Sequence, residues 1–235
     1  MTTRENLMFP RPEGEGRVLL MDKPRGWTSF DLVRTVRRIL SVKKAGHAGT
    51  LDPMASGLMI ICTEKMTKEI SGFMMLEKEY EAEMILGART SSYDQETPVI
   101  EQRSIDHLGT EDVRRVLAEF VGNQMQVPPM HSAVKVGGKR LYTYARRGKF
   151  VDRKPREVFI RSLTPTTFEL PRVSFTVVCS KGTYVRSLVS DAGTRLGCGA
   201  YLSELRRTRI GDYLLADAMT VDDLARSREA TGHLV

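Results

Sequence analysis

The order of strand-like and helix-like patterns along the chain limits its fold more than any other feature. Short apolar runs typical of buried strands occur at residues 18–20, 58–62, 158–160 and 173–178. Amphipathic helical patterns separate them at irregular intervals, and no regular βαβ repeat emerges. We therefore expect an α+β fold in which helices flank a mixed, largely antiparallel central sheet.

The first helical pattern has an apolar side and a basic side. Between residues 29 and 40, apolar side chains recur at helical spacing, whereas Arg34, Arg37 and Arg38 fall elsewhere on the helical wheel. Ser29 is expected to cap this helix. We also expect a strand over residues 80–86 and helices near residues 65–76, 110–120 and 185–196. Thr110 is expected to cap the second of these helices, and Gly197 is expected to end the third. A last helix is expected to start with a capping box of Thr220 and Asp223.

The length of the chain and its lack of breaks indicate one domain. The 235 residues are ample for a hydrophobic core. Residues 1–15 mix proline, glycine and charge without periodicity, which predicts a flexible N-terminal arm. The rest shows no internal repeat, low-complexity tract or linker, so we expect one contiguous domain over residues 16–235.

The composition is basic, with 36 Lys and Arg residues against 29 Asp and Glu residues and a formal net charge of +7. This excess favours a polyanionic partner. No stretch approaches the roughly 18 uncharged apolar residues that span a bilayer, and the N-terminus does not resemble a secretory signal. We expect no membrane association and a cytoplasmic location, where Cys62, Cys179 and Cys198 would be reduced, buried thiols.

Basic and aromatic residues concentrate between residues 127 and 156. Tyr142 and Tyr144 lie inside this segment, and Asp152 is the one acid that opposes its cations. Phosphates require cations and unstacked bases require flat rings, so the mixture indicates a nucleic-acid groove; the alternative is a solvated surface ribbon. The cations are Lys135, Lys139, Arg140, Arg146, Arg147, Lys149, Arg153, Lys154 and Arg156, and we expect Lys135, Lys139, Arg140, Arg146 and Arg147 to bind RNA.

A loop rich in glycine and proline presents a carboxylate within residues 46–57. Pro53 holds Asp52 away from helical backbone angles, so the acid stands on a stiff loop. Alternatively, Asp52 caps the following turn and the glycines only permit it. A phosphate cradle is disfavoured because the Gly-Lys-Ser/Thr ending of a P-loop is absent. His47 and Asp52 lack further metal ligands at recognisable spacing, so we predict no metal site.

A second candidate segment, residues 180–186, runs from a strand through a glycine turn into a helix. Tyr184 and Arg186 then emerge at the helix start, where anions are favoured. Arg186 could clamp a carboxylate or phosphate, or it could be an ordinary solvated helix arginine. Tyr80 lies on an alternating strand and could be a stacking platform or a half-buried packing residue.

Together these segments resemble the TruB family of pseudouridine synthases, the tRNA pseudouridine-55 synthases. The matching blocks follow the family's order between residue 18 and about residue 211. They are residues 21–29 (MDKPRGWTS), 46–57 (GHAGTLDPMASG), 78–80 (KEY), 127–135 (VPPMHSAVK), 139–142 (KRLY), 180–186 (SKGTYVR) and 205–207 (LRR).

The resemblance implies a pseudouridine synthase fold and an isomerisation that needs no cofactor. One uridine at position 55 in the T-loop of tRNA loses its glycosidic C–N bond, its base rotates, and a C–C bond forms. Asp52 matches the family's catalytic aspartate, which could attack the sugar C1′ or the base C6 or deprotonate the sugar. Because a stacked uracil is unreachable, such an enzyme extrudes the nucleotide.

The resemblance also assigns roles to other residues. Arg186 corresponds to the arginine that pairs with the catalytic aspartate and keeps it ionised. Tyr80 corresponds to a tyrosine that belongs to the catalytic set and holds the flipped base. The further matches are Tyr184 lining the pocket, Leu205 as its apolar wall, His47 securing the flipped nucleotide, and Lys23 with Pro24 bracing the catalytic loop.

The chain departs from the family's pattern in two places. Ala48 stands where many relatives have threonine, a change that should leave Asp52 in place. About two dozen residues follow the last block, too few for the added RNA-binding domain of ~50 or more residues that many relatives carry at the C-terminus. We therefore expect a single catalytic domain that recognises the T-arm of tRNA as a monomer, without an obligatory protein partner.

Two other interpretations stay open at this point. A non-catalytic tRNA-binding or RNA-folding module could use the same basic groove. The same chemistry could also act on ribosomal RNA inside a guide-RNA complex, but relatives of that kind carry the extra domain and the extensions that this chain lacks. We favour the stand-alone enzyme.

Overall fold

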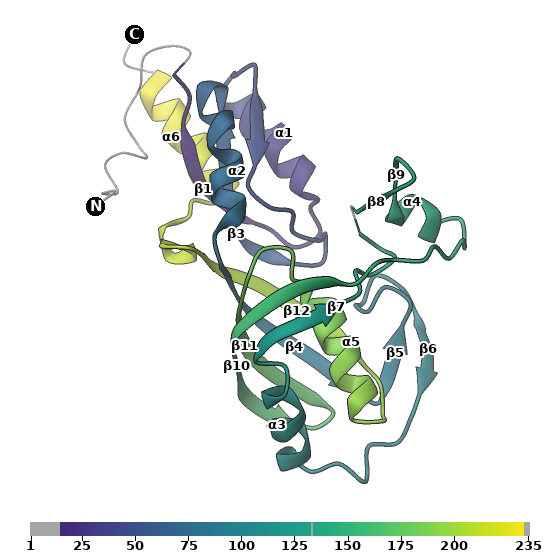
Figure 1. The fold of residues 1–235 in the computed structure, drawn as a ribbon. Coiled ribbons are helices and arrows are strands. Elements are labelled where there is room, and N and C mark those ends of the chain that lie inside the picture. Colours follow the sequence, from purple (N-terminus) through teal and green to yellow (C-terminus); the bar gives the residue numbers. More distant parts are fainter. Residues whose placement is uncertain (1–14, 133, 233–235) are drawn as a thin grey trace. The chain divides into compact units, whose positions relative to one another are not determined.

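The computed structural model describes residues 15–132 and 134–232, and it divides the chain into two compact units (Figure 1). One unit holds the residues up to Tyr80 and those from Arg206 onward, and the other holds residues 81–205. Strands β4 (Lys78–Leu86) and β12 (Ala200–Ile210) contribute residues to both units. The single domain expected over residues 16–235 stays a prediction, and the expected N-terminal arm lies, except for Glu15, outside the described residues.

The first unit is built on strand β3 (Ser56–Thr63), which is buried along almost its whole length. Strand β1 (Val18–Lys23) and the short β2 (Ala45–His47) both pair with β3 in antiparallel fashion. The end of β12 pairs with β3 in parallel, with Arg206 opposite Ser56, and β13 (Tyr213–Leu214) pairs with β12. The continuous apolar run at residues 58–62 is therefore a central strand, as expected.

The helices of this unit are α1 (Ser29–Ile39), the 3₁₀ turns η2 (Glu64–Glu69) and η3 (Leu215–Asp217), α2 (Ile70–Met75) and α6 (Val221–Gly232). The helix predicted over residues 65–76 is thus a 3₁₀ segment followed by one short α-helix. The predicted capping box of Thr220 and Asp223 is present at the start of α6. Side chains of α2 pack on a core that includes Leu58, Ile60 and Ile210.

The cap of α1 differs from the prediction. Thr28, not Ser29, is the N-cap residue: its hydroxyl accepts from the Asp31 amide at 3.1 Å, and the Asp31 carboxylate accepts from the Thr28 amide at 3.0 Å. Ser29 is buried, and its hydroxyl bonds the backbone of Leu51 instead. The Ser29 hydroxyl therefore makes a tertiary hydrogen bond, although the local sequence pattern predicts that it caps the helix.

The second unit contains the strand order β12–β4–β11–β10–β7. Strand β10 (Arg156–Glu169) is antiparallel to β11 (Arg172–Cys179) on one side and to β7 (Gly122–Gln126) on the other. Strands β5 (Ala88–Thr90) and β6 (Val99–Gln102) form a separate antiparallel pair. Helix α5 (Val185–Arg195) ends before Gly197 as expected, whereas the N-cap of α3 (Thr110–Ala118) is Gly109 and not Thr110.

The basic segment between β7 and β10 contains a small hairpin and a helical turn. Strands β8 (Lys135–Val136) and β9 (Lys139–Arg140) are joined by Gly137 and Gly138, whose φ angles are 56° and 79°. A two-residue turn with positive φ at both positions favours glycine. Helix α4 (Leu141–Ala145) follows directly, and the Tyr144 hydroxyl donates to the Val136 carbonyl at 3.3 Å.

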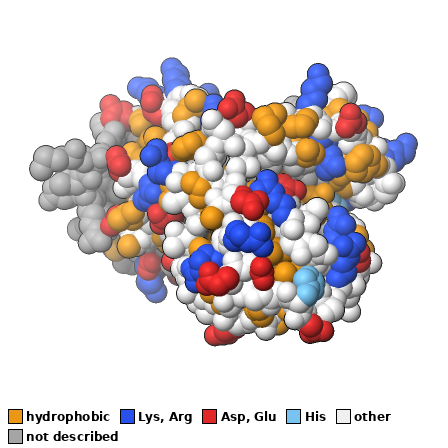
Figure 2. All heavy atoms as spheres, turned by 60° about the horizontal axis from the view of Figure 1, so that its bottom comes forward, with side chains coloured by type: hydrophobic (Ala, Val, Ile, Leu, Met, Phe, Trp, Pro, Cys, Tyr) orange, Lys and Arg blue, Asp and Glu red, His pale blue; other side chains and the backbone are white. Residues whose placement is uncertain are grey.

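These observations confirm an α+β fold whose sheet is mixed and largely antiparallel. All three cysteines are buried and free, as predicted. Within the described ranges, no helix combines the length and apolar character needed to cross a membrane. Acidic and basic side chains are interspersed on the face that Figure 2 shows, so the net charge of +7 does not form one continuous field there.

Candidate active site

The Asp52 loop joins β2 to β3. Hydrogen bonds to its own main-chain groups hold it on both sides of the acid. The Ser29 hydroxyl donates to the Leu51 carbonyl and accepts from the Leu51 amide, each at 2.9 Å. On the other side, the Ala55 amide donates to the Asp52 carbonyl at 3.1 Å. Asp52 itself is half-buried. The loop therefore presents its carboxylate from an anchored backbone, as the sequence predicts.

Arg207 fastens this loop from β12, and the sequence analysis gave it no role. Its side chain is 1 % exposed, its Nε donates to the Leu58 carbonyl at 2.7 Å, and its Nη2 donates to the Gly49 carbonyl at 3.3 Å. Gly57 has a φ of +105°, and a Cβ there would lie 2.4 Å from the Arg207 carbonyl oxygen. The one sequence clue to the role of Arg207 was its position in the Leu-Arg-Arg block. A sequence rarely indicates that an arginine is buried.

Lys23 is fully buried beside the same loop. Its Nζ donates to the carbonyls of Pro24 at 2.9 Å and Trp27 at 2.7 Å, which closes the turn between them. The Gly26 amide of that turn donates to the Pro53 carbonyl at 2.7 Å. Burial lowers the pKa of Lys23 to about 8, and the negative charge of Asp52 opposes that shift. These contacts support the predicted bracing role of Lys23.

His47 and Tyr80 belong to the same unit as Asp52. His47 lies in β2 opposite Ile61, and burial lowers its pKa, which favours a neutral imidazole near pH 7. Tyr80 is 8 % exposed in β4. The carboxylate of the preceding Glu79 accepts from Thr208 Oγ1 at 2.9 Å and pairs with Arg209 at 3.1 Å, so contacts to β12 fix this stretch of β4.

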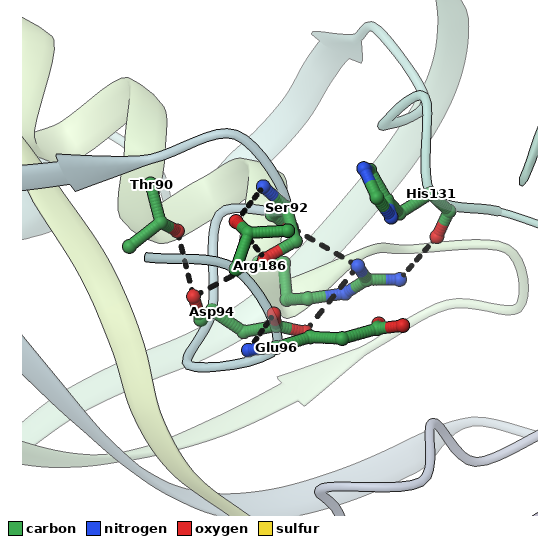
Figure 3. A network of polar contacts seen from close by, with 7 residues as sticks. Thr90, Ser92, Asp94, Glu96, His131 and Arg186 are labelled. Atoms are coloured by element: carbon green, nitrogen blue, oxygen red, sulfur yellow. Dashed lines mark hydrogen bonds and ion pairs between the residues drawn. The ribbon is translucent and has the colours of Figure 1, made fainter. Parts of the chain in front are cut away.

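Arg186 lies in the other unit and is the centre of a buried polar network (Figure 3). It is 2 % exposed, which rules out the alternative of a solvated helix arginine. Its Nη1 lies 3.4 Å from the Asp94 carboxylate and donates to the Ser92 carbonyl at 3.0 Å. Its Nη2 donates to the His131 carbonyl at 2.8 Å. Because Asp52 belongs to the first unit, its pairing with Arg186 stays a prediction.

Asp94 is the main site residue that the sequence analysis missed. The Thr90 hydroxyl donates to the Asp94 carbonyl at 2.6 Å, and the Glu96 amide donates to its carboxylate at 2.9 Å (Figure 3). The carboxylate is buried with Arg186 and compensates its charge, which a buried guanidinium needs. The only available signal was a run of short polar residues after a strand, which is typical of any loop.

Tyr184 and Leu205 also belong to the second unit. Tyr184 precedes α5, and the buried amide side chain of Gln126 accepts from its backbone N–H at 2.7 Å and donates to its carbonyl at 3.0 Å. The Arg156 guanidinium lies 5.4 Å from the centre of the Tyr184 ring. Leu205 is half-buried in β12. Gln126 was another residue that the sequence analysis did not single out.

The predicted RNA-binding residues are exposed where the structure describes them. Lys139, Arg146 and Arg147 are exposed, whereas the side chains of Lys135 and Arg140 lie outside the described part of the structure. Cations stack on aromatic rings here, with Arg146 at 5.5 Å from the Tyr142 ring centre and Arg153 at 4.8 Å from that of Phe150. Phe150 is 76 % exposed, so aromatic surface is available to an unstacked base.

No group of three or more His, Cys, Asp and Glu side chains that could hold a metal ion occurs among residues 15–132 and 134–232. The prediction of no metal site is not tested by this observation. The candidate functional groups are Asp52, a half-buried carboxylate, and Tyr80 in the first unit, and Arg186, a buried arginine, and Tyr184 in the second.

Comparison with known proteins places this chain in a family. The model described as "TruB family pseudouridylate synthase (N terminal domain)" matches residues 37–185, and the "tRNA pseudouridylate synthase B C-terminal domain" matches residues 186–232. The tRNA pseudouridine synthase B of Chloroherpeton thalassium is 45 % identical over 229 residues, covering 95 % of this chain and 93 % of that protein. That of Burkholderia pseudomallei is 50 % identical over 207 residues, covering 88 % and 68 %.

Solved structures give the same result at the level of the fold. The archaeal box H/ACA sRNP Nop10–Cbf5 complex contains a chain with a TM-score of 0.69 and 28 % identity, which matches 93 % of this chain and 57 % of its own length. A Cbf5–Nop10–Gar1 complex gives a TM-score of 0.69 at 29 % identity, covering 96 % and 61 %. These matches confirm the fold and the family expected from the sequence blocks. The chain belongs to the TruB family of pseudouridylate synthases.

Proposed function

We propose that this protein converts the uridine at position 55 in the T-loop of tRNA to pseudouridine. The observation that carries the proposal is Asp52, a half-buried carboxylate on a loop anchored at Leu51 and Ala55. Membership of the TruB family and relatives named tRNA pseudouridine synthase B support this reaction. The reaction is an isomerisation, so no group is gained or lost overall.

In the proposed reaction, the bond between C1′ and N1 breaks, the uracil rotates, and a bond forms between C1′ and C5. C5 loses its proton, and N1, which is no longer bonded to C1′, gains one. The Asp52 carboxylate attacks C1′ or C6, or it removes a proton from the sugar. Each of these roles requires an ionised carboxylate at neutral pH, and the buried positive charge of Lys23 beside the loop favours that form.

Arg186 is proposed to pair with Asp52 when the substrate is bound. The bonds from its guanidinium to Asp94, Ser92 and His131 fix its position before any substrate arrives. A preorganised guanidinium costs no reorganisation during the reaction and would both hold and stabilise an ionised partner. Asp94 acts here as a positioning residue.

The target base must leave the T-loop stack before it can react. Extrusion costs a few kcal/mol, which the enzyme offsets by stacking and edge contacts. Tyr80, Tyr184 and Leu205 supply the flat and apolar surfaces for this role, and His47 secures the nucleotide. A neutral imidazole, favoured by the lowered pKa of His47, can both donate and accept a hydrogen bond.

The exposed cations and aromatic rings of the segment 127–156 are proposed to hold the T-arm. Lys139, Arg146 and Arg147 reach solvent, and the ring of Tyr142 lies beneath Arg146. Binding through phosphates should weaken as salt rises, because it releases counterions. We further propose that the enzyme acts alone as a monomer in the cytoplasm.

The direct test uses an unmodified tRNA transcript and the purified protein alone, with pseudouridine mapped at each position. We expect a single modified site in the T-loop, no product from Asp52→Ala, and tRNA affinity within about threefold of wild type for that variant. Asp212→Ala, which removes an exposed acid of the same unit, is the matched control and should keep full activity. Undiminished product from Asp52→Ala would refute the proposal.

The same experiment separates the other interpretations. Tight tRNA binding by the wild-type protein without pseudouridine would support a non-catalytic RNA module. Product that forms on ribosomal RNA only when a guide RNA is added would support the guide-dependent reading.

A further inference from the structure

The outer face of α1 gathers cations around one exposed aromatic ring. Residues 30, 34, 37 and 38 are spaced three, four, seven and eight positions apart, which places them on one side of a helix. All four are exposed, whereas Leu32, Val33 and Val36 on the other side are buried. The proposed function leaves this surface without a role.

The cationic surface continues past the helix through the exposed side chains of Lys43 and Lys44. Residues 32–51 contain no Asp or Glu. We define the α1 basic face as Phe30, Arg34, Arg37, Arg38, Lys43 and Lys44. This local excess contrasts with the face in Figure 2, where acidic and basic side chains are interspersed.

Two carboxylates that contact this stretch of the chain, those of Asp31 and Glu64, accept hydrogen bonds from backbone amides. Asp31 accepts from the Thr28 amide at 3.0 Å as part of the capping box, and it also pairs with Arg34 at 3.1 Å. Glu64 accepts from the backbone amides of Lys43 at 2.6 Å and Lys44 at 3.2 Å. These bonds hold the acids in structural roles and fix the backbone that carries the two lysines.

The charges of Arg37, Arg38, Lys43 and Lys44 are not compensated within the described part of the chain, where none of these side chains has an ion pair. Arg34 and Arg38 lie four residues apart on α1, where like charges repel one another, so the arrangement is more stable when an anion binds. The arginines of helix α3 differ, because carboxylates of the same helix compensate them. Arg114 pairs with Glu111 at 3.4 Å, and Arg115 pairs with Asp112 at 3.1 Å.

Phe30 indicates what kind of anion fits. Its side chain is 68 % exposed in the first turn of α1, one helical turn before Arg34. An aromatic ring beside several cations matches a nucleic acid, whose phosphates take the cations and whose bases or sugars pack on the ring. A small inorganic anion would make no use of the ring.

We propose that the α1 basic face is a second RNA-binding surface, which contacts the backbone of the substrate separately from the segment 127–156. The identity of that RNA as tRNA rests on the proposed function. Helix α1 packs against β2, and β2 leads directly into the Asp52 loop of the same unit. Phosphates held by this face would therefore anchor the unit that carries the catalytic carboxylate.

The test compares two double variants that remove the same charge. Arg37→Gln/Arg38→Gln should raise the tRNA dissociation constant on the order of tenfold at 0.1 M salt and lower the slope of log K against log salt by about 2. Arg114→Gln/Arg115→Gln, whose arginines are already paired with carboxylates, should change the dissociation constant less than about twofold. The maximal rate of pseudouridine formation at saturating tRNA should stay within about twofold in both.

Additional measurements keep electrostatics apart from folding. Arg37→Lys/Arg38→Lys keeps both charges and should restore affinity to within about threefold of wild type. Lys43→Gln/Lys44→Gln should repeat the loss seen on the helix, and Phe30→Ala should weaken binding without changing the salt slope. Equal affinities and slopes for the α1 and α3 double variants would overturn this proposal.

Failure of the proposed function has a different signature. A wild-type protein that binds tRNA with a steep salt slope but forms no pseudouridine would contradict the enzyme while leaving the basic face testable by binding alone. A protein that forms pseudouridine normally, with no effect of the α1 variants on affinity, would contradict the basic face alone.

Discussion

Asp52 and Arg186, the two groups proposed to meet at the reacting uridine, are held in different ways. Asp52 is half-buried on a short loop. Hydrogen bonds fix the main-chain groups of Leu51, which bond the Ser29 hydroxyl, and of Ala55, which bonds the Asp52 carbonyl. Arg186 is almost completely buried, and residues that are 55 and 94 positions away in the sequence accept from its guanidinium. The glycines, the proline and the aspartate mark the first arrangement in the sequence, although Ser29 and Arg207 anchor it from a distance, whereas no local pattern marks the second. The two should therefore respond differently to substitution.

Asp94→Ala should have the largest effect, because it removes a buried carboxylate that pairs with Arg186. Leaving the Arg186 guanidinium buried without its carboxylate should lower the free energy of unfolding by about 3 to 5 kcal/mol. Pseudouridine formation should fall by at least about 100-fold, since a misplaced guanidinium no longer supports Asp52. Urea unfolding followed by circular dichroism and single-turnover assays measure the two effects.

Two further variants show what the Asp94 result means. Asp106→Ala removes an exposed acid from the same unit and should change stability by less than about 0.5 kcal/mol. Asp94→Asn keeps the shape and loses the charge, so it should lie between Asp94→Ala and wild type in stability. Wild-type stability and rate in Asp94→Ala would mean that the network in Figure 3 does not position Arg186.

Gly57→Ala tests whether close backbone packing between β3 and β12 holds the Asp52 loop. At a φ of +105°, an added Cβ would lie 2.4 Å from the Arg207 carbonyl oxygen, and that atom belongs to a paired strand that cannot move easily. We expect a loss of about 2 kcal/mol or more in the free energy of unfolding, together with a lower rate because the Asp52 loop shifts.

Gly72→Ala is the matched control for the glycine substitution. Nothing lies within 4 Å of a Cβ at Gly72, which sits inside α2, so alanine there should stabilise the helix by up to about 1 kcal/mol. If Gly57→Ala were as stable as Gly72→Ala, close packing of β3 against β12 would not be what holds the loop.

Sequence patterns predicted elements well where neighbouring residues decide the structure. The buried strand at residues 58–62 and the capping box of Thr220 and Asp223 both depend on local spacing, and both are present. The helix expected over residues 65–76 is broken, and neither η2 nor α2 has a side-chain cap hydrogen bond at its start. Ser29 was misassigned as a cap because its true partner, Leu51, is 22 residues away.

The residues of the candidate site likewise divide into those that local sequence indicates and those that only distant contacts define. The Asp52 loop could be found because glycine, proline and aspartate have meanings that do not depend on distant contacts. Asp94, Gln126 and Arg207 were missed because each is defined by burial and by partners far along the chain. No period or motif signals that a polar residue will be buried; only the packed structure shows which charge compensates it.

A pH dependence belongs to the loop side of the comparison alone. Burial lowers the pKa of Lys23 from 10.5 to about 8, so between these values the unfolded chain binds a proton that the folded protein has lost. The free energy of unfolding contributed by this group therefore rises with pH from about 8 to 10.5, and it is flat below 8. The raised pKa values of the Cys62 and Cys198 thiols oppose this rise, but they act in both proteins. Urea unfolding across pH 7 to 10.5 should therefore show the rise as a growing difference between wild type and Lys23→Met. Asp94→Asn should keep the rise, because arginine stays protonated over the whole range and the Arg186 network does not titrate there. A rise that survives in Lys23→Met would assign the titration to another group and remove Lys23 as the positive charge that supports the Asp52 loop.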